Sequence, residues 1–439
     1  MNQPEMGTLL HASRLLATAL FGIAGFCELG CGTGDGGGRG GAGGLPRGSS
    51  SDATSDVGAG GASPSGATGD PTQAASSSTS ASSTSSGDGA GGDGCVDLCP
   101  APDGGVFWGC KTRFLYGTNW AWRNWGADFG GVAAWGSEGV AQASASVSSD
   151  MQQMRAAGVS VIRWWMWPRL LTESIQFGED DAPSSLEGSL VADVQKALEL
   201  AEVNDVYLIL TPFSFDNFFP TAVEGGILSR SLEPMVTDPA RRQKLMDNLI
   251  TPLAQAVESS PYRKRLLAWD MINEPEWAIA GPGLYGGEDF TPSPSLESVT
   301  HAQMETFLKE MASTLHASSG ALVTIGSAAI KWSRAWSHVD VDFYQLHYYD
   351  WVYAWYPYQT VTLEAVGLTD KPVVMGEFPN QGLAAVGGHP ARTAAELQAD
   401  LWDQGYAGAI SWAYNDGAFP WDPAALSTFA GLHPCETTF

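Results

Sequence analysis

Short apolar runs recur along the chain after about residue 110, and polar or amphipathic segments separate them. The runs are rich in β-branched and aromatic residues and are bounded by turn-forming residues, which is typical of strands buried on both faces. They predict strands at 114–119, 159–165, 206–211, 266–272, 321–325, 343–347, 373–375 and 408–412.

Helical periodicity fills most of the intervals between these strands. Residues 189–203 place Leu190, Val194 and Leu198 on one face, and Asp238-Pro239 combines an N-cap with a proline at the first helical position. Helices are expected at 150–157, 189–203, 239–259, 300–317 and 393–404, and no helix is clearly indicated after the fifth and sixth strands. Eight strands alternating with helices predict an α/β fold, a (β/α)8 TIM barrel.

A low-complexity segment precedes the barrel. Residues 32–94 consist almost entirely of Gly, Ser, Ala, Thr and Asp, which cannot bury enough apolar surface to offset their ordering entropy. We therefore expect a disordered, Gly/Ser-rich linker at 32–94 and one folded domain at 95–439, long enough for a single large core.

The amino-terminal segment 1–31 is typical of an export signal. Arg14 precedes an apolar run, 15–26, that is too short for a confident membrane span. Cys27 and Cys31 follow directly and resemble the cysteine of a bacterial lipoprotein signal. Secretion and lipid anchoring to a bacterial membrane both stay open, as does which cysteine is lipidated. Either way the domain is expected outside the cell or on its surface.

The charge balance narrows the possible partners. The 439 residues carry 22 Lys and Arg against 48 Asp and Glu, a formal net charge of −26. An acidic surface repels phosphate backbones, so nucleic acid is excluded as a partner, and a neutral substrate is favoured. The 17 tryptophans supply flat faces for sugar rings as well as core residues. A monomer is expected.

Four cysteines fall within the predicted domain, at 95, 99, 110 and 435. In an exported domain they suggest two disulfides, with three possible connectivities. A bridge from the 95–110 segment to Cys435 would join the two ends of the barrel. No Cys/His spacing resembles a metal site, and neither a metal nor a cofactor is expected.

Polar residues stand where several predicted strands end. Glu274 follows the fourth strand and Glu377 the seventh, while His347 and Trp412 end the sixth and eighth. The carboxyl ends of barrel strands meet on one face, where active sites lie. Two carboxylates brought together there are what glycoside hydrolysis requires.

With these positions in place, residues 110–432 resemble glycoside hydrolase family 5, within the clan of barrel glycosidases that keep glutamates on strands four and seven. The matching residues are Asn273-Glu274-Pro275, Gly376-Glu377-Phe378, His347-Tyr348-Tyr349, Arg163 and Trp412. The tripeptide Asn-Glu-Pro alone arises by chance, whereas all these residues in this order are specific for the family.

The resemblance implies a role for each matching residue. Glu274 is the expected general acid/base and Glu377 the expected nucleophile of a retaining mechanism. Arg163 and Tyr349 would keep Glu377 ionised, and His347 would orient or tune Glu274 or the sugar. Asn273 would bond the sugar 2-hydroxyl, and Trp412 would form the floor under the reacting sugar. Trp120, Trp277 and Trp332 are added as candidate substrate-binding platforms because they lie near strand ends.

The end of the third strand departs from the family pattern. Many members carry a histidine there, whereas this chain reads Thr211-Pro-Phe-Ser-Phe-Asp216. Ser214 and Asp216 are the two candidates for its role, which leaves the substrate subgroup open.

The function expected from the sequence is a retaining endo-β-glycosidase acting on β-mannan or β-1,4-glucan. The alternatives are an exo-acting β-glycosidase, a transglycosylase, a carbohydrate-binding barrel without catalysis, and an adhesive surface lipoprotein. Retention of both glutamates disfavours the last two, because a purely structural role leaves them unexplained.

Overall fold

The computed structural model describes residues 97–286 and 289–439. The predicted signal 1–31, the linker 32–94 and Cys27, Cys31 and Cys95 lie outside this range, so those expectations stay predictions. Among the described helices, none has the length and hydropathy needed to cross a bilayer.

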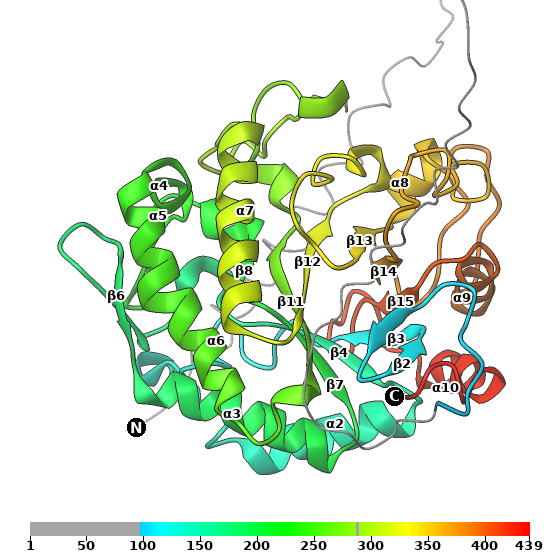
Figure 1. The fold of residues 1–439 in the computed structure, drawn as a ribbon, viewed down its shortest axis with the longest axis horizontal. Helices are drawn as coiled ribbons and strands as arrows, with labels where there is room; N and C mark the ends of the chain where they lie inside the picture. Colours follow the sequence, from blue (N-terminus) through cyan, green and yellow to red (C-terminus); the bar gives the residue numbers. More distant parts are fainter. Residues whose placement is uncertain (1–96, 287–288) are drawn as a thin grey trace, which may run out of the picture. The chain divides into compact units, whose positions relative to one another are not determined.

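Eight parallel strands form the closed barrel expected from the sequence (Figure 1). In barrel order they are β3 (Leu115–Asn119), β4 (Val161–Trp165), β7 (Tyr207–Thr211), β11 (Leu266–Asn273), β12 (Leu322–Ser327), β13 (Tyr344–His347), β14 (Val373–Glu377) and β15 (Gly408–Ser411). Pairing of β15 with β3 and of β11 with β12 leaves no open edge in the ring.

Additional short strands lie outside the eight-stranded ring. They are β1 (Val106–Trp108) with β2 (Lys111–Arg113), β5 (Ile175–Phe177) with β6 (Pro183–Leu186), and β9 (Ala222–Glu224) with β10 (Ile227–Ser229). A further two-residue strand, β8 (Phe213–Ser214), lengthens the parallel pairing beside the end of β11. The loop after β7 is thereby fixed to the strand that carries Glu274.

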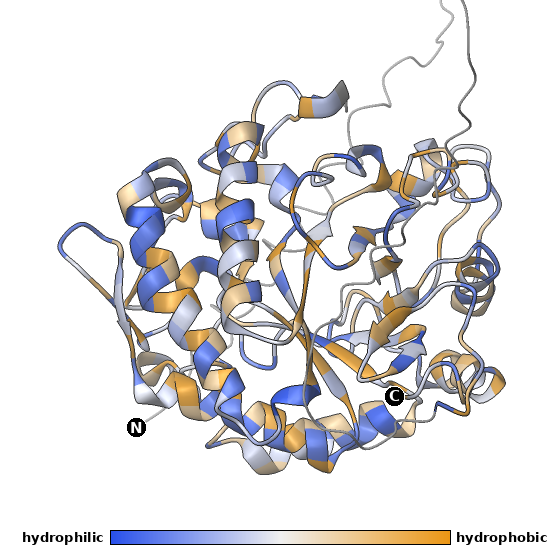
Figure 2. Ribbon diagram, in the orientation of Figure 1, coloured by the Kyte–Doolittle hydropathy of each residue, from blue (hydrophilic) through white to orange (hydrophobic). Residues whose placement is uncertain are grey.

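The helices lie around the strands (Figure 1). Their bounds are α2 (Ser144–Ala156), α3 (Gly188–Val203), α4 (Glu233–Thr237), α5 (Pro239–Leu245), α6 (Thr251–Glu258), α7 (His301–Ser318), α8 (Asp350–Trp355), α9 (Ala394–Asp403) and α10 (Pro423–Leu432). Figure 2 shows hydrophilic and hydrophobic bands along these helices, as expected for elements with one face on the core.

Two helical expectations need correction. The helix placed at 150–157 begins at Ser144, because its Ser- and Ala-rich first turns carry little hydrophobic signal beyond the buried Val147. The helix at 239–259 is interrupted by a π segment, Met246–Ile250, next to Pro252, which has no N–H to continue the regular bonding. Among described residues between β12 and β13, the only helical element is the single turn Ile330–Trp332, in agreement with the weak helical signal after the fifth strand.

Two apolar clusters make up most of the core. The larger lies between strands and helices and includes Leu198, Met271 and Leu308. The smaller gathers side chains such as Val161, Leu267 and Val374 from early in the strands. The interior near the strand starts is thus packed, and polar groups are left for the opposite end.

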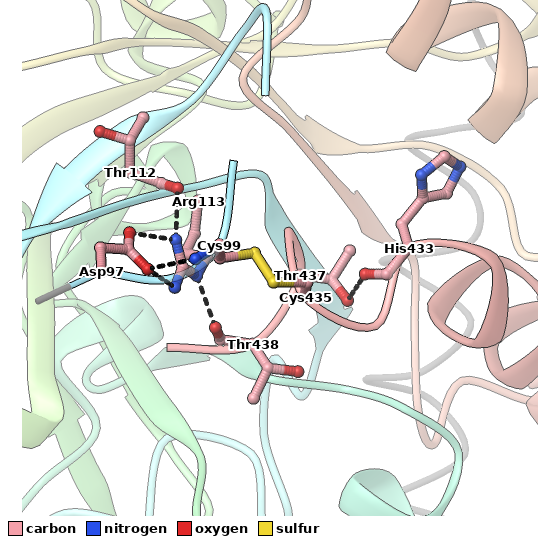
Figure 3. The surroundings of a disulfide bond; sticks show 8 residues. All are labelled: Asp97, Cys99, Thr112, Arg113, His433, Cys435, Thr437 and Thr438. Carbon is pink, nitrogen blue, oxygen red and sulfur yellow. Dashed lines mark hydrogen bonds and ion pairs between the residues drawn. A yellow bond between two sulfur atoms is a disulfide. The ribbon is translucent and has the colours of Figure 1, made fainter. Parts of the chain in front are cut away.

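The two ends of the domain are fastened together (Figure 3). Cys99 and Cys435 form a disulfide that joins positions 336 residues apart. Beside it, the Arg113 guanidinium bonds the Asp97 carboxylate at 2.7 Å and the Thr438 carbonyl oxygen at 2.6 Å. The expected bridge from the 95–110 segment to Cys435 is confirmed, and Cys110 is also disulfide-bonded. A link across so long a loop restricts the unfolded chain strongly.

Candidate active site

A buried arginine lies at the centre of the strand ends. Arg163 Nε donates to Asp270 Oδ2 at 2.8 Å, and its Nη1 donates to Asn119 Oδ1 at 2.8 Å and to Glu377 Oε1 at 2.7 Å. Its Nη2 donates to Asn273 Oδ1 at 2.7 Å. All five side chains are buried. One guanidinium therefore fixes residues from four strands, β3, β4, β11 and β14, relative to one another.

Glu274 sits at the end of β11 in an unusual backbone conformation. Its φ and ψ are 49° and 51°, a left-handed geometry that costs a non-glycine residue about 1–2 kcal/mol. Its N–H donates to the Gly326 carbonyl oxygen at 2.6 Å, which holds the turn. Trp277 Nε1 donates to Glu274 Oε2 at 2.7 Å, and His347 Nδ1 lies 2.8 Å from Oε1. Both carboxyl oxygens are thus oriented.

The environment of Glu274 favours its protonated form. The side chain is only 2% exposed, and this burial raises its pKa to about 7, against the opposing effects of Trp277 and Arg163. A carboxylic acid that keeps its proton near neutral pH is suited to general acid chemistry.

Glu377 has different partners. Arg163 contacts Oε1, the Tyr349 hydroxyl donates to Oε2 at 2.7 Å, and His347 Nδ1 lies 3.4 Å from Oε1. Burial raises the pKa of Glu377, while His347, Arg163 and Tyr349 act in the opposite direction. The carboxylate is thus supplied with donors that favour its charged form.

His347 joins the two carboxyl groups without adding a positive charge. It is fully buried, and burial lowers its pKa to about 4. The imidazole is therefore neutral at neutral pH. Its Nε2 is buried without a hydrogen-bond partner among the described residues.

One donor atom from each of Glu274, His347 and Glu377 lies within 4.8 Å of the others. Such a set resembles a metal ligand group, but the Arg163 guanidinium already occupies one side of Glu377 and opposes a second cation. The same closeness places the two carboxyl groups at the short separation typical of retaining rather than inverting glycosidases.

The four expected tryptophans fall into two groups. Trp277 is half-buried, and its ring lies near those of Trp332 and Trp351 at centroid distances of 5.7 and 5.8 Å. Trp412, directly after β15, is 3% exposed and packs in a cluster with Trp165 and Tyr349, and Tyr349 bonds Glu377. These two tryptophans belong with the glutamates.

Trp120 and Trp332 are less suited to bind a sugar than expected. Trp120 is 1% exposed and stacks on Trp164 with centroids 4.4 Å apart, so it is a core residue. Phe290 stacks on Trp332, and Lys331 Nζ lies 4.0 Å from its ring centroid. Trp120 leaves the candidate set, because its ring packs on Trp164 and Tyr414 rather than on a residue bonded to either glutamate. Trp332 lies edge-on to Trp277.

Asp270 and Asn119 also belong to the site, although neither was expected there from the sequence. Asp270 accepts bonds from Arg163, from the Gly326 N–H at 2.7 Å and from Gln345 Nε2 at 3.0 Å. A carboxylate inside an apolar strand was a usable signal, because such a charge must be paired. Glu276, a second buried carboxyl two residues beyond Glu274, instead accepts bonds from Ser327, Ala328 and Trp336.

No family model matches the chain. A mannan endo-1,4-beta-mannosidase of Cryptopygus antarcticus is 25% identical over 73% of this chain and 85% of its own length. One of Mytilus edulis is 24% identical over 69% and 84%. The solved β-mannanase of Mytilus edulis superposes with a TM-score of 0.59 at 20% identity, covering 76% of this chain and 95% of that one, which supports the barrel fold. The relatives confirm the resemblance to glycoside hydrolase family 5.

Replacing Arg163 tests its central position. In Arg163→Met, two buried carboxylates lose their cation, and we expect the free energy of unfolding to fall by about 3–5 kcal/mol. Denaturant unfolding measures the change. Arg241→Met is the control, because Arg241 is partly exposed and its contact to Asp238 is 3.7 Å long, so its loss should cost under about 1 kcal/mol. Equal stabilities of the two variants would contradict the central role of Arg163.

Proposed function

Since the chain is a glycoside hydrolase that resembles the β-mannanases of family 5, we propose that it hydrolyses β-1,4-mannan internally by a retaining double displacement. The observation that carries this proposal is the pair Glu274 and Glu377, whose oxygens lie within 4.8 Å of each other in unlike environments. The names of the two relatives favour β-mannan over β-1,4-glucan.

In the first step, Glu377 attacks the anomeric carbon, and the bond from that carbon to the glycosidic oxygen breaks. Glu274 gives its proton to the departing oxygen, and a glycosyl ester remains on Glu377. Arg163 and Tyr349, both bonded to the Glu377 carboxylate, orient the attacking oxygen. Tight positioning of this kind replaces the entropy cost of bringing the groups together.

In the second step, Glu274 takes a proton from water, and the water oxygen displaces Glu377 from the anomeric carbon. Glu377 carries no negative charge while it is esterified, and this loss of a neighbouring charge lowers the pKa of Glu274. After it has given up its proton, Glu274 therefore stays ionised and can act as the base. Asn273, held by Arg163, is the proposed partner of the sugar 2-hydroxyl. Trp412 is proposed as the aromatic surface that binds sugar on the Glu377 side of the site, and Trp277 as the one on the Glu274 side.

We also propose that the enzyme works outside the cell on a neutral polymer, consistent with the net charge of −26. Anchoring through Cys27 or Cys31 stays a prediction from the sequence.

A polysaccharide panel tests the substrate and the nucleophile together. Reducing-sugar release by the full chain should be largest on mannan or glucomannan, and smaller on carboxymethylcellulose, mixed-linkage glucan and xylan. Glu377→Gln should lower turnover by orders of magnitude, and Glu274→Gln by about 10²–10⁴-fold. Glu364→Gln, at an exposed glutamate, is the matched control. Near-normal hydrolysis by Glu377→Gln would rule out the proposed nucleophile, and release from cellulose alone would rule out the proposed substrate.

The pH dependence follows from the two carboxyl groups. Glu274 must be protonated, so kcat/KM should fall as pH rises through about 7. Glu377 must be ionised, so kcat/KM should also fall on the acidic side, at a pH above the ordinary glutamate range. Glu274→Ala, assayed on an aryl glycoside whose leaving group needs no proton, should lose the basic limb. A basic limb that persists in this variant would assign it to another group.

A further inference from the structure

A third carboxyl group lies beside Glu274, and the mechanism above does not use it. The parallel pairing of β8 with β11 places Ser214 opposite Asn273, the residue directly before Glu274. Asp216 follows two residues later in the turn Phe215–Phe218 and is 8% exposed. The chain therefore fixes Asp216 on the strand-three side of Glu274.

The immediate contacts of Asp216 only partly balance its charge. The Ser214 hydroxyl donates to Asp216 Oδ2 at 3.0 Å. Arg169 is the nearby cation, but its guanidinium is already paired with Glu224 of β9. Its Nε is buried without a partner among the described residues, and its φ of 64° is left-handed. Asp216, Glu224 and Arg169 together hold two carboxylates and one guanidinium, so their net charge is negative when all three are ionised.

We propose that Asp216 is a positioning residue for the acid/base step: its carboxylate, fixed beside Glu274 by the β8–β11 pairing, holds the proton on Glu274 until the glycosidic oxygen takes it. A negative charge nearby disfavours ionisation of a neighbouring acid. This inference rests on the proposed function, because Glu274 must be the acid for its proton to matter.

Among the other groups that face Glu274, Glu377 also disfavours its ionisation, but only until the glycosyl-enzyme forms. Trp277 and Arg163 favour the ionised form of Glu274, and His347 from β13 is neutral. Glu377 from β14 is neutralised in part by Arg163 and Tyr349, and it loses its charge in the glycosyl-enzyme. Asp216 forms no ester, so its carboxyl group stays beside Glu274 through both steps.

The two carboxyl groups are electrostatically coupled. Burial raises the pKa of Asp216 to about 6, with the charge of Glu274 contributing, and burial raises the pKa of Glu274 to about 7. Both groups therefore titrate near neutral pH as an interacting pair. Electrostatic coupling between two sites is reciprocal, so each acid disfavours ionisation of the other.

The test measures the titration of Glu274 directly. The full chain is prepared with ¹³C-labelled glutamate carboxyl groups, and Glu274→Gln identifies the Glu274 signal. In Asp216→Asn, the pKa of Glu274 should fall by roughly 0.5 unit or more, and the basic limb of kcat/KM should move to lower pH by the same amount. The acidic limb should stay in place.

Two further variants make the test specific. Ser214→Ala removes the donor to Asp216, so less of Asp216 is ionised near pH 6, and a smaller shift in the same direction is expected even where Asp216→Asn does not fold. Glu276→Gln removes another buried carboxyl, two residues from Glu274, whose partners are Ser327, Ala328 and Trp336. It should leave the titration of Glu274 in place.

An unchanged Glu274 titration in folded Asp216→Asn, or in Ser214→Ala if the first variant does not fold, would overturn the proposal. An equal shift in Glu276→Gln would overturn it too. The proposed function fails by a different observation, namely turnover that survives in Glu377→Gln. The carboxyl titration needs no turnover, so the two failures are distinguishable.

Discussion

Arg163 carries the only guanidinium among the described residues that is bonded to Glu377, and its four partners come from strands far apart in the sequence. Moving a guanidinium and two carboxylates out of water costs several kcal/mol per ion, so the cluster persists only when its bonds are satisfied together. The side chain of Arg163 thus requires β3, β4, β11 and β14 to meet in one register. The packed core near the strand starts and the disulfide between Cys99 and Cys435 maintain that closure.

The same cluster separates the roles of the two glutamates. Glu377 receives the cation and the Tyr349 hydroxyl, whereas Glu274 receives an indole N–H and a neutral imidazole. Two identical side chains in one buried site thereby differ in their affinity for a proton. Asp216, held near Glu274 by the β8–β11 pairing, is proposed to add to this difference.

Much of this arrangement follows from the sequence. Glu274 and Glu377 end buried apolar runs, and the ends of parallel strands meet on one face, so their encounter follows from strand count and order. Arg163 within an apolar strand needed a partner, and its pairing with Glu377 was predicted. Its bonds to Asn119 and Asp270 depend on side-chain reach across the barrel, which strand patterns do not describe.

Sequence patterns do not distinguish a tryptophan of the core from one at the site. Trp120 and Trp277 both follow strand ends, and an indole suits a core as well as a sugar-binding surface. Only the stacking on Trp164 places Trp120 inside, and only the bond to Glu274 places Trp277 at the site. Likewise, Asp270 lies on β11 and Glu274 directly follows its end, and the pairing of Asp270 with Arg163 indicates that Asp270 is structural.

The most direct measurement traps the intermediate. An activated 2-deoxy-2-fluoro-β-mannobioside slows breakdown of a glycosyl-enzyme, and mass spectrometry of the intact and digested protein locates the attached sugar. The account predicts one fluoro-glycosyl unit per chain, on the peptide that contains Glu377, and none in Glu377→Gln. Attachment to another residue, or ongoing hydrolysis with inversion at the anomeric carbon and no adduct, would contradict it.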